Sequence, residues 1–192
     1  MGRMLMTGFD PFGGETINPA WEAVRRLPDR IGPWEIERLM VPTVFGEASR
    51  TALEAARKLQ PDVILCVGQA GGRGGVTPER IAVNIRDAKI ADNAGNIPAG
   101  EQILETGPAA YFSTVPVKEM ACAIQACGIS AAVSNSAGAF VCNDTLYLLL
   151  HHYSQTRTRL GFIHVPYLPE QGTPSMKLED TVRALIAAIE VC

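Results

Sequence analysis

The five apolar residues Val-Ile-Leu-Cys-Val within Asp62–Gln69 constrain the fold of this chain more than any other segment. Successive side chains of a strand point to opposite faces of a sheet, so a strand of this composition is buried on both faces. Strands of that kind occur almost only in parallel sheets that carry helices on either side. The segment therefore predicts the centre of a layered α/β fold.

Strand-like and helix-like segments alternate along the rest of the chain. The expected strands are Arg3–Phe9, Trp34–Val41, Asp62–Gln69, Arg80–Ile90, Ile129–Asn135 and Gly161–Val165. The expected helices are Asn18–Leu27, Glu47–Leu59, Val117–Cys127, Cys142–His152 and Thr173–Val191. This alternation predicts a three-layer α/β/α sandwich, with a mostly parallel, twisted sheet between helices. The 192 residues are expected to form one domain (residues 1–192) with a core that needs no disulfide or metal ion.

Capping residues and turn formers mark where several of these segments begin and end. Asn18 followed by Pro19 predicts the start of one helix, and Thr173 followed by Pro174 predicts the start of the last. The Gly, Asn and Pro residues of Asp92–Gly107 predict a long surface excursion between regular elements.

Four loops directly follow expected strands: Gly8–Gly14, Gln69–Gly75, Ser136–Cys142 and Val165–Gln171. In open α/β sheets, ligands bind beyond the carboxyl ends of the strands. The four loops are therefore expected to meet at one edge of the sheet and to form a site there.

Cys142 is the residue in these loops with the clearest chemical meaning. It lies where a strand pattern ends and a helix pattern begins, and a helix N-terminus favours a thiolate. His164, in the next expected strand, can exchange a proton with it, and Glu79 is a carboxylate able to orient a histidine. Cys66, in the buried strand, is instead expected to pack in the core.

Charge and composition argue against several classes of function. A net charge of −3 offers no electrostatic attraction to nucleic acid or acidic membranes, and no apolar run is long enough to span a bilayer. The odd number of cysteines, five, with no secretory segment at the start, predicts a reducing cytoplasm. No paired CxxC or HExxH motif is present, so neither a metal site nor a cofactor is expected.

The two glycine-rich loops leave a second class of function open. Gly8–Gly14 faintly resembles a phosphate loop, which would suit a transferase acting on phosphates or nucleosides. The lysine that grips phosphate is missing, because Gly14 and Glu15 follow the second glycine. Phe9 and Phe12 in this segment suit the wall of an apolar pocket better.

Four segments together resemble one known family. They are TGFDPFGGETINPAWEAV, VGQAGG followed by TPERIAVNI, SNSAGAFVCN and GFIHVPYLPEQ, and they occur in the same order in the pyroglutamyl-peptidase I (pyrrolidone-carboxylate peptidase) family. The resemblance implies a phosphorylase/hydrolase-like fold and a thiol exopeptidase that removes N-terminal pyroglutamyl residues from peptides. It also implies a homotetramer that needs no cofactor.

The resemblance assigns residues to roles. It implies that Cys142 is the nucleophile, His164 the general acid/base and Glu79 the acidic third member. The residues implied to contact the pyroglutamyl ring are Phe9, Phe12, Gln69, Ile90, Phe140 and Val141. The family segment Asp-Ala-Arg-Ile reads Asp-Ala-Lys-Ile here, so Lys89 stands where an arginine helps at the oxyanion. Lysine keeps the charge but lacks the planar fork. This difference leaves open a catalytically weakened protein that only binds pyroglutamyl peptides.

Overall fold

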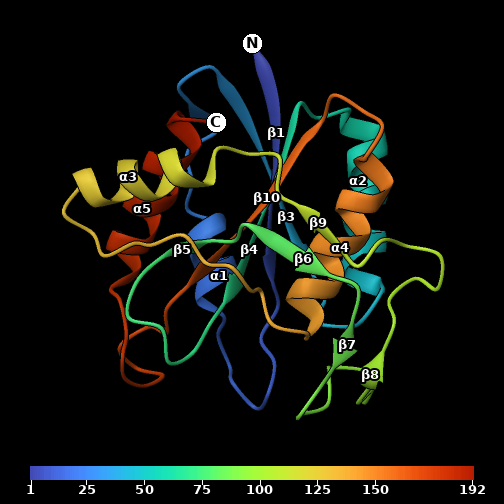
Figure 1. The fold of residues 1–192 in the computed structure, drawn as a ribbon. Helices are drawn as coiled ribbons and strands as arrows, with labels where there is room; N and C mark the ends of the chain where they lie inside the picture. Colours follow the sequence, from blue (N-terminus) through green and yellow to red (C-terminus); the bar gives the residue numbers. More distant parts are fainter.

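The computed structural model describes residues 1–192, and a six-stranded sheet runs through its centre (Figure 1). The strand order is β2-β3-β1-β4-β10-β5. The bounds are β1 Gly2–Phe9, β2 Arg30–Ile31, β3 Trp34–Val41, β4 Val63–Gln69, β5 Thr77–Pro78 and β10 Arg159–Val165. β3, β1, β4 and β10 are parallel, whereas the short edge strands β2 and β5 run antiparallel to their neighbours. The predicted, mostly parallel sheet is confirmed.

β4 lies between β1 and β10, and its residues Val63–Val67 are fully buried. Val63, Leu65 and Val67 belong to one hydrophobic core, and Ile64 and Cys66 belong to the other. The apolar run is therefore covered on both faces, as its composition predicts.

The helices form one layer on each face of the sheet. α1 Pro19–Val24, α3 Val117–Ala126 and α5 Leu178–Glu190 supply side chains to the first core. α2 Glu47–Leu59 and α4 Val141–Tyr153 supply the second. In Figure 1 the two groups lie left and right of the sheet, so the α/β/α sandwich is confirmed. None of the helices combines the length and the apolar character that crossing a bilayer requires.

Several helix and strand ends lie where the residues of the segment itself predict them. The bounds of Trp34–Val41 and Glu47–Leu59 are as predicted. Asn18 caps α1 by accepting a hydrogen bond from the Ala20 N–H at 3.0 Å, and Pro19 is the first helical residue. α1 ends at Val24, three residues before the predicted end.

Two predicted elements differ in extent from the prediction. Ile129–Asn135 is not a regular strand, but it runs parallel to residues 76–80: Ala131 and Ser134 form bridges to Val76 and Glu79, and the Ser134 N–H donates to the Pro78 carbonyl oxygen at 2.9 Å. The last helix begins at Leu178 rather than near Thr173. The Met176 N–H instead donates to the Tyr167 carbonyl oxygen at 2.8 Å, so this segment runs beside the loop that follows β10.

The middle of the chain contains short strand pairs that the sequence does not announce. Arg80–Ile90 is interrupted and divides into β6 Ile81–Val83 and β7 Arg86–Asp87. β6 pairs with β9 Ala110–Phe112, and β7 pairs with β8 Ala99–Glu101. The predicted excursion is thus partly ordered, and its Asp92 is 5% exposed and accepts hydrogen bonds from the Phe45 and Asn96 backbone N–H groups.

Candidate active site

His164 and Glu79 meet at the edge of the sheet because β5 runs antiparallel to β10. His164 pairs with Thr77, and the Glu79 N–H donates to the Phe162 carbonyl oxygen at 2.8 Å. This pairing brings the two side chains together: His164 Nδ1 lies 2.7 Å from Glu79 Oε1. Both side chains are buried, Glu79 completely and His164 to 4% exposure. The predicted histidine–carboxylate contact is present.

Cys142 approaches the same part of the sheet from α4. A Cβ atom on Gly68 would lie 2.9 Å from Cys142 Sγ, so the sulfur lies directly over that glycine. Gly68 is the register partner of His164 in the neighbouring strand, and paired residues of parallel strands face the same side. The thiol therefore lies on the face of the sheet that carries the His164 imidazole.

Two buried polar side chains hold the start of α4 in this position. Asn143 accepts from the Val83 N–H at 2.9 Å and donates to the Val83 and Ile85 carbonyl oxygens. Asp144 accepts from the Gly46 N–H at 2.8 Å and from Arg86 Nε at 2.6 Å. The residues that follow Cys142 thus anchor it to β6, to β7 and to the loop before α2.

The turn that leads into α4 leaves the backbone at Cys142 available. Gly138 has a φ of +79°, a conformation that favours glycine. Cys142 is the second residue of the helix, and its N–H has no backbone acceptor in the protein. A free N–H in the first turn of a helix is a donor suited to a developing negative charge.

The environment sets the protonation states of the three side chains. Burial, followed by the charge of Glu79, raises the pKa of the Cys142 thiol to about 12. Burial also lowers the pKa of His164, against the opposing influence of Glu79. Burial alone would raise the pKa of Glu79, but the hydrogen bonds from His164, Ser134 and Arg73 hold it below its ordinary value. A neutral thiol, a neutral imidazole and a carboxylate follow at neutral pH.

The sequence predicted that the position of Cys142 favours a thiolate, and burial of the sulfur opposes that tendency. Desolvation of the sulfur, which lies over Gly68, is the largest cause of the raised pKa of the Cys142 thiol. Since the carboxylate accepts from Nδ1, the imidazole proton lies on Nδ1 and Nε2 is the basic atom.

Aromatic side chains extend from the site across the loops. The Phe12 and Phe140 ring centroids are 5.9 Å apart, and Phe140 makes an edge contact with Phe45 at 5.3 Å. Ile90 is 50% exposed and lies near Gly13, which belongs to the same loop as Phe12. Phe9 and Val141 are almost completely buried and pack in the core beneath.

Gln69 and Gln171 join two of the strand-end loops. Gln171 Nε2 donates to Gln69 Oε1 at 3.1 Å, while Gln171 Oε1 accepts from the Leu168 N–H at 3.0 Å. These contacts direct the oxygen of the Gln69 amide toward Gln171 and leave its NH₂ group as the free donor. Gln171 was not predicted as part of the site.

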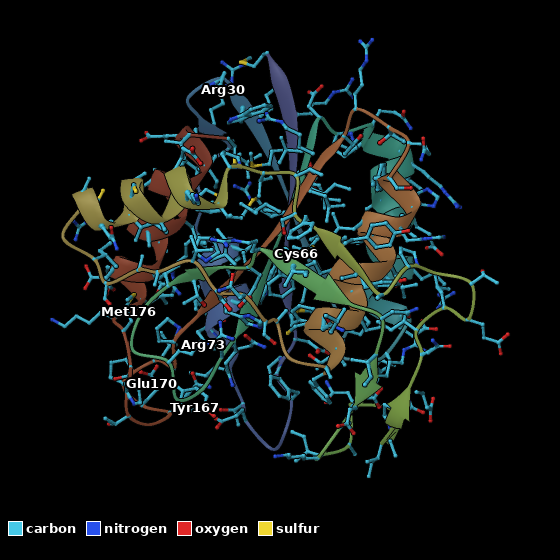
Figure 2. All side chains as sticks on the ribbon, viewed as in Figure 1. Arg30, Cys66, Arg73, Tyr167, Glu170 and Met176 are labelled. Carbon is cyan, nitrogen blue, oxygen red and sulfur yellow. The ribbon has the colours of Figure 1, made fainter.

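Two cations lie near the candidate site, and only one of them makes contacts within the protein. Lys89 is exposed and makes no hydrogen bond or ion pair. Arg73, to which the sequence assigned no role, donates to Glu79 Oε1 at 2.6 Å. In Figure 2, Arg73 and Tyr167 lie among the loops beyond the sheet, and Cys66 lies near the middle of it. The only signal for Arg73 was its place in the loop after β4.

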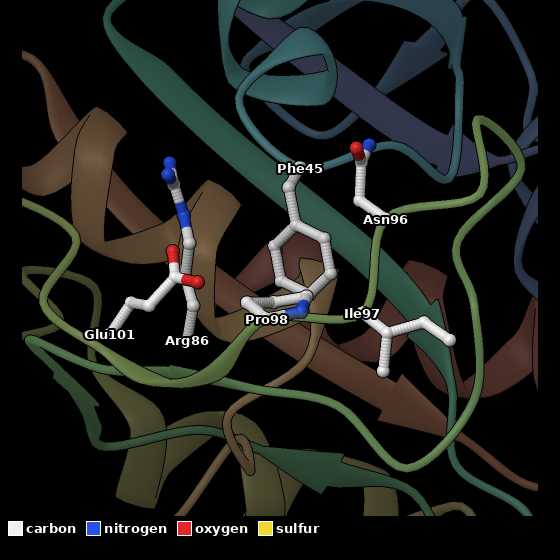
Figure 3. Close-up of a pocket in the computed structure, with 6 residues that line it drawn as sticks. All are labelled: Phe45, Arg86, Asn96, Ile97, Pro98 and Glu101. Atoms are coloured by element: carbon white, nitrogen blue, oxygen red, sulfur yellow. The ribbon is translucent and has the colours of Figure 1, made fainter.

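A cavity of about 320 Å³ lies beside this part of the molecule (Figure 3). Its lining residues are Phe45, Arg86, Asn96, Ile97, Pro98 and Glu101. Phe45 lines the cavity and also makes the edge contact with Phe140, and the Arg86 guanidinium carbon lies 5.9 Å from the centre of the Phe45 ring. The cavity therefore adjoins the aromatic wall without containing Cys142 or His164.

Comparisons with known proteins match almost the whole chain. A family model described as pyroglutamyl peptidase matches residues 2–192. The pyrrolidone-carboxylate peptidase of Alkaliphilus oremlandii is 49% identical over 97% of this chain and 91% of its own length. The crystal structure of Bacillus amyloliquefaciens pyroglutamyl peptidase I has a TM-score of 0.96 at 49% identity, covering 100% of this chain and 96% of that one. The pyrrolidone carboxyl peptidase of Thermococcus litoralis has a TM-score of 0.94 at 35% identity, covering 100% and 93%.

Proposed function

Because the chain belongs to the pyroglutamyl peptidase family, a family of hydrolases, we propose that it cleaves the bond after an N-terminal pyroglutamyl residue with Cys142, His164 and Glu79. The observation that supports this assignment most is the 2.7 Å contact between His164 Nδ1 and Glu79 Oε1, next to the glycine that Cys142 Sγ covers. Nucleophile, base and orienting carboxylate are the three groups that such catalysis needs.

The protonation states define the proposed order of proton transfers. His164 Nε2 removes the thiol proton as the sulfur attacks the pyroglutamyl carbonyl carbon. The resulting imidazolium then protonates the leaving amine as the C–N bond breaks, which leaves a thioester on Cys142. Water, activated by His164, hydrolyses the thioester and restores the thiol. Glu79 keeps the Nδ1 proton in place and stabilises the imidazolium.

The negative oxygen formed during attack needs donors that are already in place. The free Cys142 N–H in the first turn of α4 is one proposed donor. Lys89 remains the proposed second contact, and its exposed side chain would have to fold over the bound substrate. Each donor of this kind contributes about 3 to 4 kcal/mol where it has been removed from other enzymes.

The substrate ring is small, flat and neutral, since its nitrogen is closed into a lactam. Phe12, Phe140 and Ile90 are the proposed walls, and Phe9 and Val141 support them from the core. The NH₂ group of Gln69 is the proposed donor to the lactam oxygen. An ordinary N-terminal residue would place an ammonium group against aromatic rings, which costs desolvation free energy.

A fluorogenic pyroglutamyl amide tests the proposed function. We expect hydrolysis in the presence of a thiol reductant, inactivation by iodoacetamide, and protection by a pyroglutamate analogue. Chelators are expected to leave the rate unchanged. A protein that binds a pyroglutamyl peptide without cleaving it would be the weakened binder, and phosphate-dependent cleavage of a nucleoside would favour the transferase.

Gly68→Ala tests the place of the sulfur. The added methyl group would lie 2.9 Å from Cys142 Sγ and 2.7 Å from Phe162 Cζ, so both must move. We expect kcat to fall by about 100-fold, since displacements near 1 Å have effects of that size. Gly74→Ala is the matched control, because its methyl group would make only an ordinary 3.7 Å contact. Equal kcat values for the two variants would contradict the placement of Cys142.

Three further predictions from the sequence are kept as part of this proposal. These are the single peptidase domain, the homotetramer and the cytoplasmic location.

A further inference from the structure

Arg73 contacts the candidate site through three hydrogen bonds. Its Nη1 lies 2.6 Å from Glu79 Oε1 and 2.6 Å from Thr77 Oγ1, and its Nη2 donates to the Ser136 carbonyl oxygen at 3.0 Å. The guanidinium therefore joins the loop after β4, the strand that carries Glu79, and the loop that leads to Cys142. Its side chain is 31% exposed, whereas that of Glu79 is completely buried.

Three side chains stabilise the ionised Glu79 carboxylate: His164, Ser134 and Arg73. Oε1 accepts from both His164 Nδ1 and Arg73 Nη1, while Oε2 is buried without a hydrogen-bond partner. Desolvation disfavours the charged form of a buried carboxyl group, and only nearby positive charge and hydrogen bonds oppose that effect. Arg73 is the one permanently charged group that contacts this carboxylate.

This ion pair differs from the surface pairs of the molecule. Arg50–Glu47 and Arg183–Asp180 join neighbours on a helix surface, where such pairs contribute little. Arg73 instead crosses the glycine-rich loop to reach a carboxylate that also holds a histidine. The charge-assisted bond is of the stronger kind, and it fixes the direction of Oε1.

We propose that Arg73 is a positioning residue for the catalytic histidine. Its guanidinium holds the Glu79 carboxylate with Oε1 toward His164, and its bond to Ser136 ties that carboxylate to the loop before Cys142. The role rests on the proposed function, since it acts through Glu79 and not on the substrate. Arg73 also lowers the pKa of His164 through its charge, which helps to keep the imidazole unprotonated at neutral pH.

Steady-state kinetics of Arg73→Met test this role. We expect kcat to fall on the order of 10- to 100-fold, the usual effect of losing a charge-assisted hydrogen bond, with KM nearly unchanged. The acid limb of kcat/KM is expected to move to higher pH, because protonation of His164 becomes easier without the nearby positive charge. Arg73→Lys, which restores the charge but cannot bridge to Ser136, is expected to recover part of kcat.

A double mutant separates positioning from loop stability. Because Arg73 acts through the carboxylate, Arg73→Met is expected to change kcat little when Glu79 is already Gln. Arg80→Met is the control, since Arg80 adjoins Glu79 in sequence but its side chain makes no ion pair. Arg73→Gln carries the same expectations if Arg73→Met does not fold, as judged by thermal melting.

Two results would overturn the proposal. One is an Arg73→Met enzyme with the kcat and acid limb of Arg80→Met. The other is an equal loss of kcat from Arg73→Met in the wild-type and Glu79→Gln backgrounds. Either result leaves the proposed function intact as long as the wild-type protein cleaves the pyroglutamyl amide. An inactive wild-type protein would instead defeat the proposed function, and the role of Arg73 with it.

Discussion

The Cys142→Ala protein is expected to fold and to lose its peptidase activity. No other group at the site can form the thioester, so kcat for a pyroglutamyl amide should fall by roughly 10⁴- to 10⁶-fold, the range seen when a triad nucleophile or its partner is removed. The change deletes one sulfur over Gly68 and leaves the anchors Asn143 and Asp144 in place. The free energy of unfolding should therefore change by only about 1 kcal/mol.

Cys66→Ala is the matched control for this prediction. It removes a second buried thiol, two residues from Gly68 on β4, and that thiol takes no part in the proposed reaction. Its loss is expected to lower the melting temperature slightly and to leave kcat near the wild-type value. Wild-type turnover by Cys142→Ala would exclude Cys142 as the nucleophile, and parallel losses in both variants would point to packing rather than chemistry.

The second large effect is expected from Glu79→Gln. The isosteric side chain can keep the contact to His164 but loses the negative charge that stabilises the imidazolium. A loss of kcat of about 10²- to 10⁴-fold is expected on that ground. Glu105→Gln removes the same charge at an exposed position and is expected to have no effect.

Glu79→Gln is also expected to shift the acid limb of the kcat/KM pH profile. Burial lowers the pKa of His164, and the Glu79 carboxylate opposes that decrease. Without the carboxylate the pKa falls further, so the acid limb of kcat/KM, where His164 takes up a proton and ceases to be a base, moves to lower pH. This shift is opposite to that expected for Arg73→Met. An acid limb at the wild-type position would show that His164 does not control it.

The fold could be predicted where a segment's own pattern decides its structure. The run Val63–Val67 predicted burial on both faces, and Asn18 with Pro19 predicted the start of α1. Ile129–Asn135 has a strand-like pattern as well, yet it pairs only irregularly with residues 76–80, beside the short edge strand β5. Whether an apolar segment joins a sheet depends on which edges are free, and that information lies elsewhere in the chain.

Some residues of the candidate site could be predicted from the sequence and others could not. Cys142 stands out because a helix begins beside it, and His164 because it lies in the next expected strand; the resemblance to a known family then assigned Glu79 its place beside them. Arg73 carries no comparable signal, since its partner is defined only when β5 pairs with β10 and brings Glu79 under the glycine-rich loop. The protonation state of Cys142 was also beyond the sequence, because it depends on how closely the sulfur packs over Gly68.

Mass spectrometry of the reacting enzyme tests the central claim most directly. The wild-type protein is mixed with a pyroglutamyl ester or amide, quenched in acid and digested. The mechanism predicts that the peptide containing Cys142 carries the added mass of one pyroglutamyl group, and that hydroxylamine removes it. A pyroglutamyl adduct on a residue other than Cys142 would contradict the mechanism.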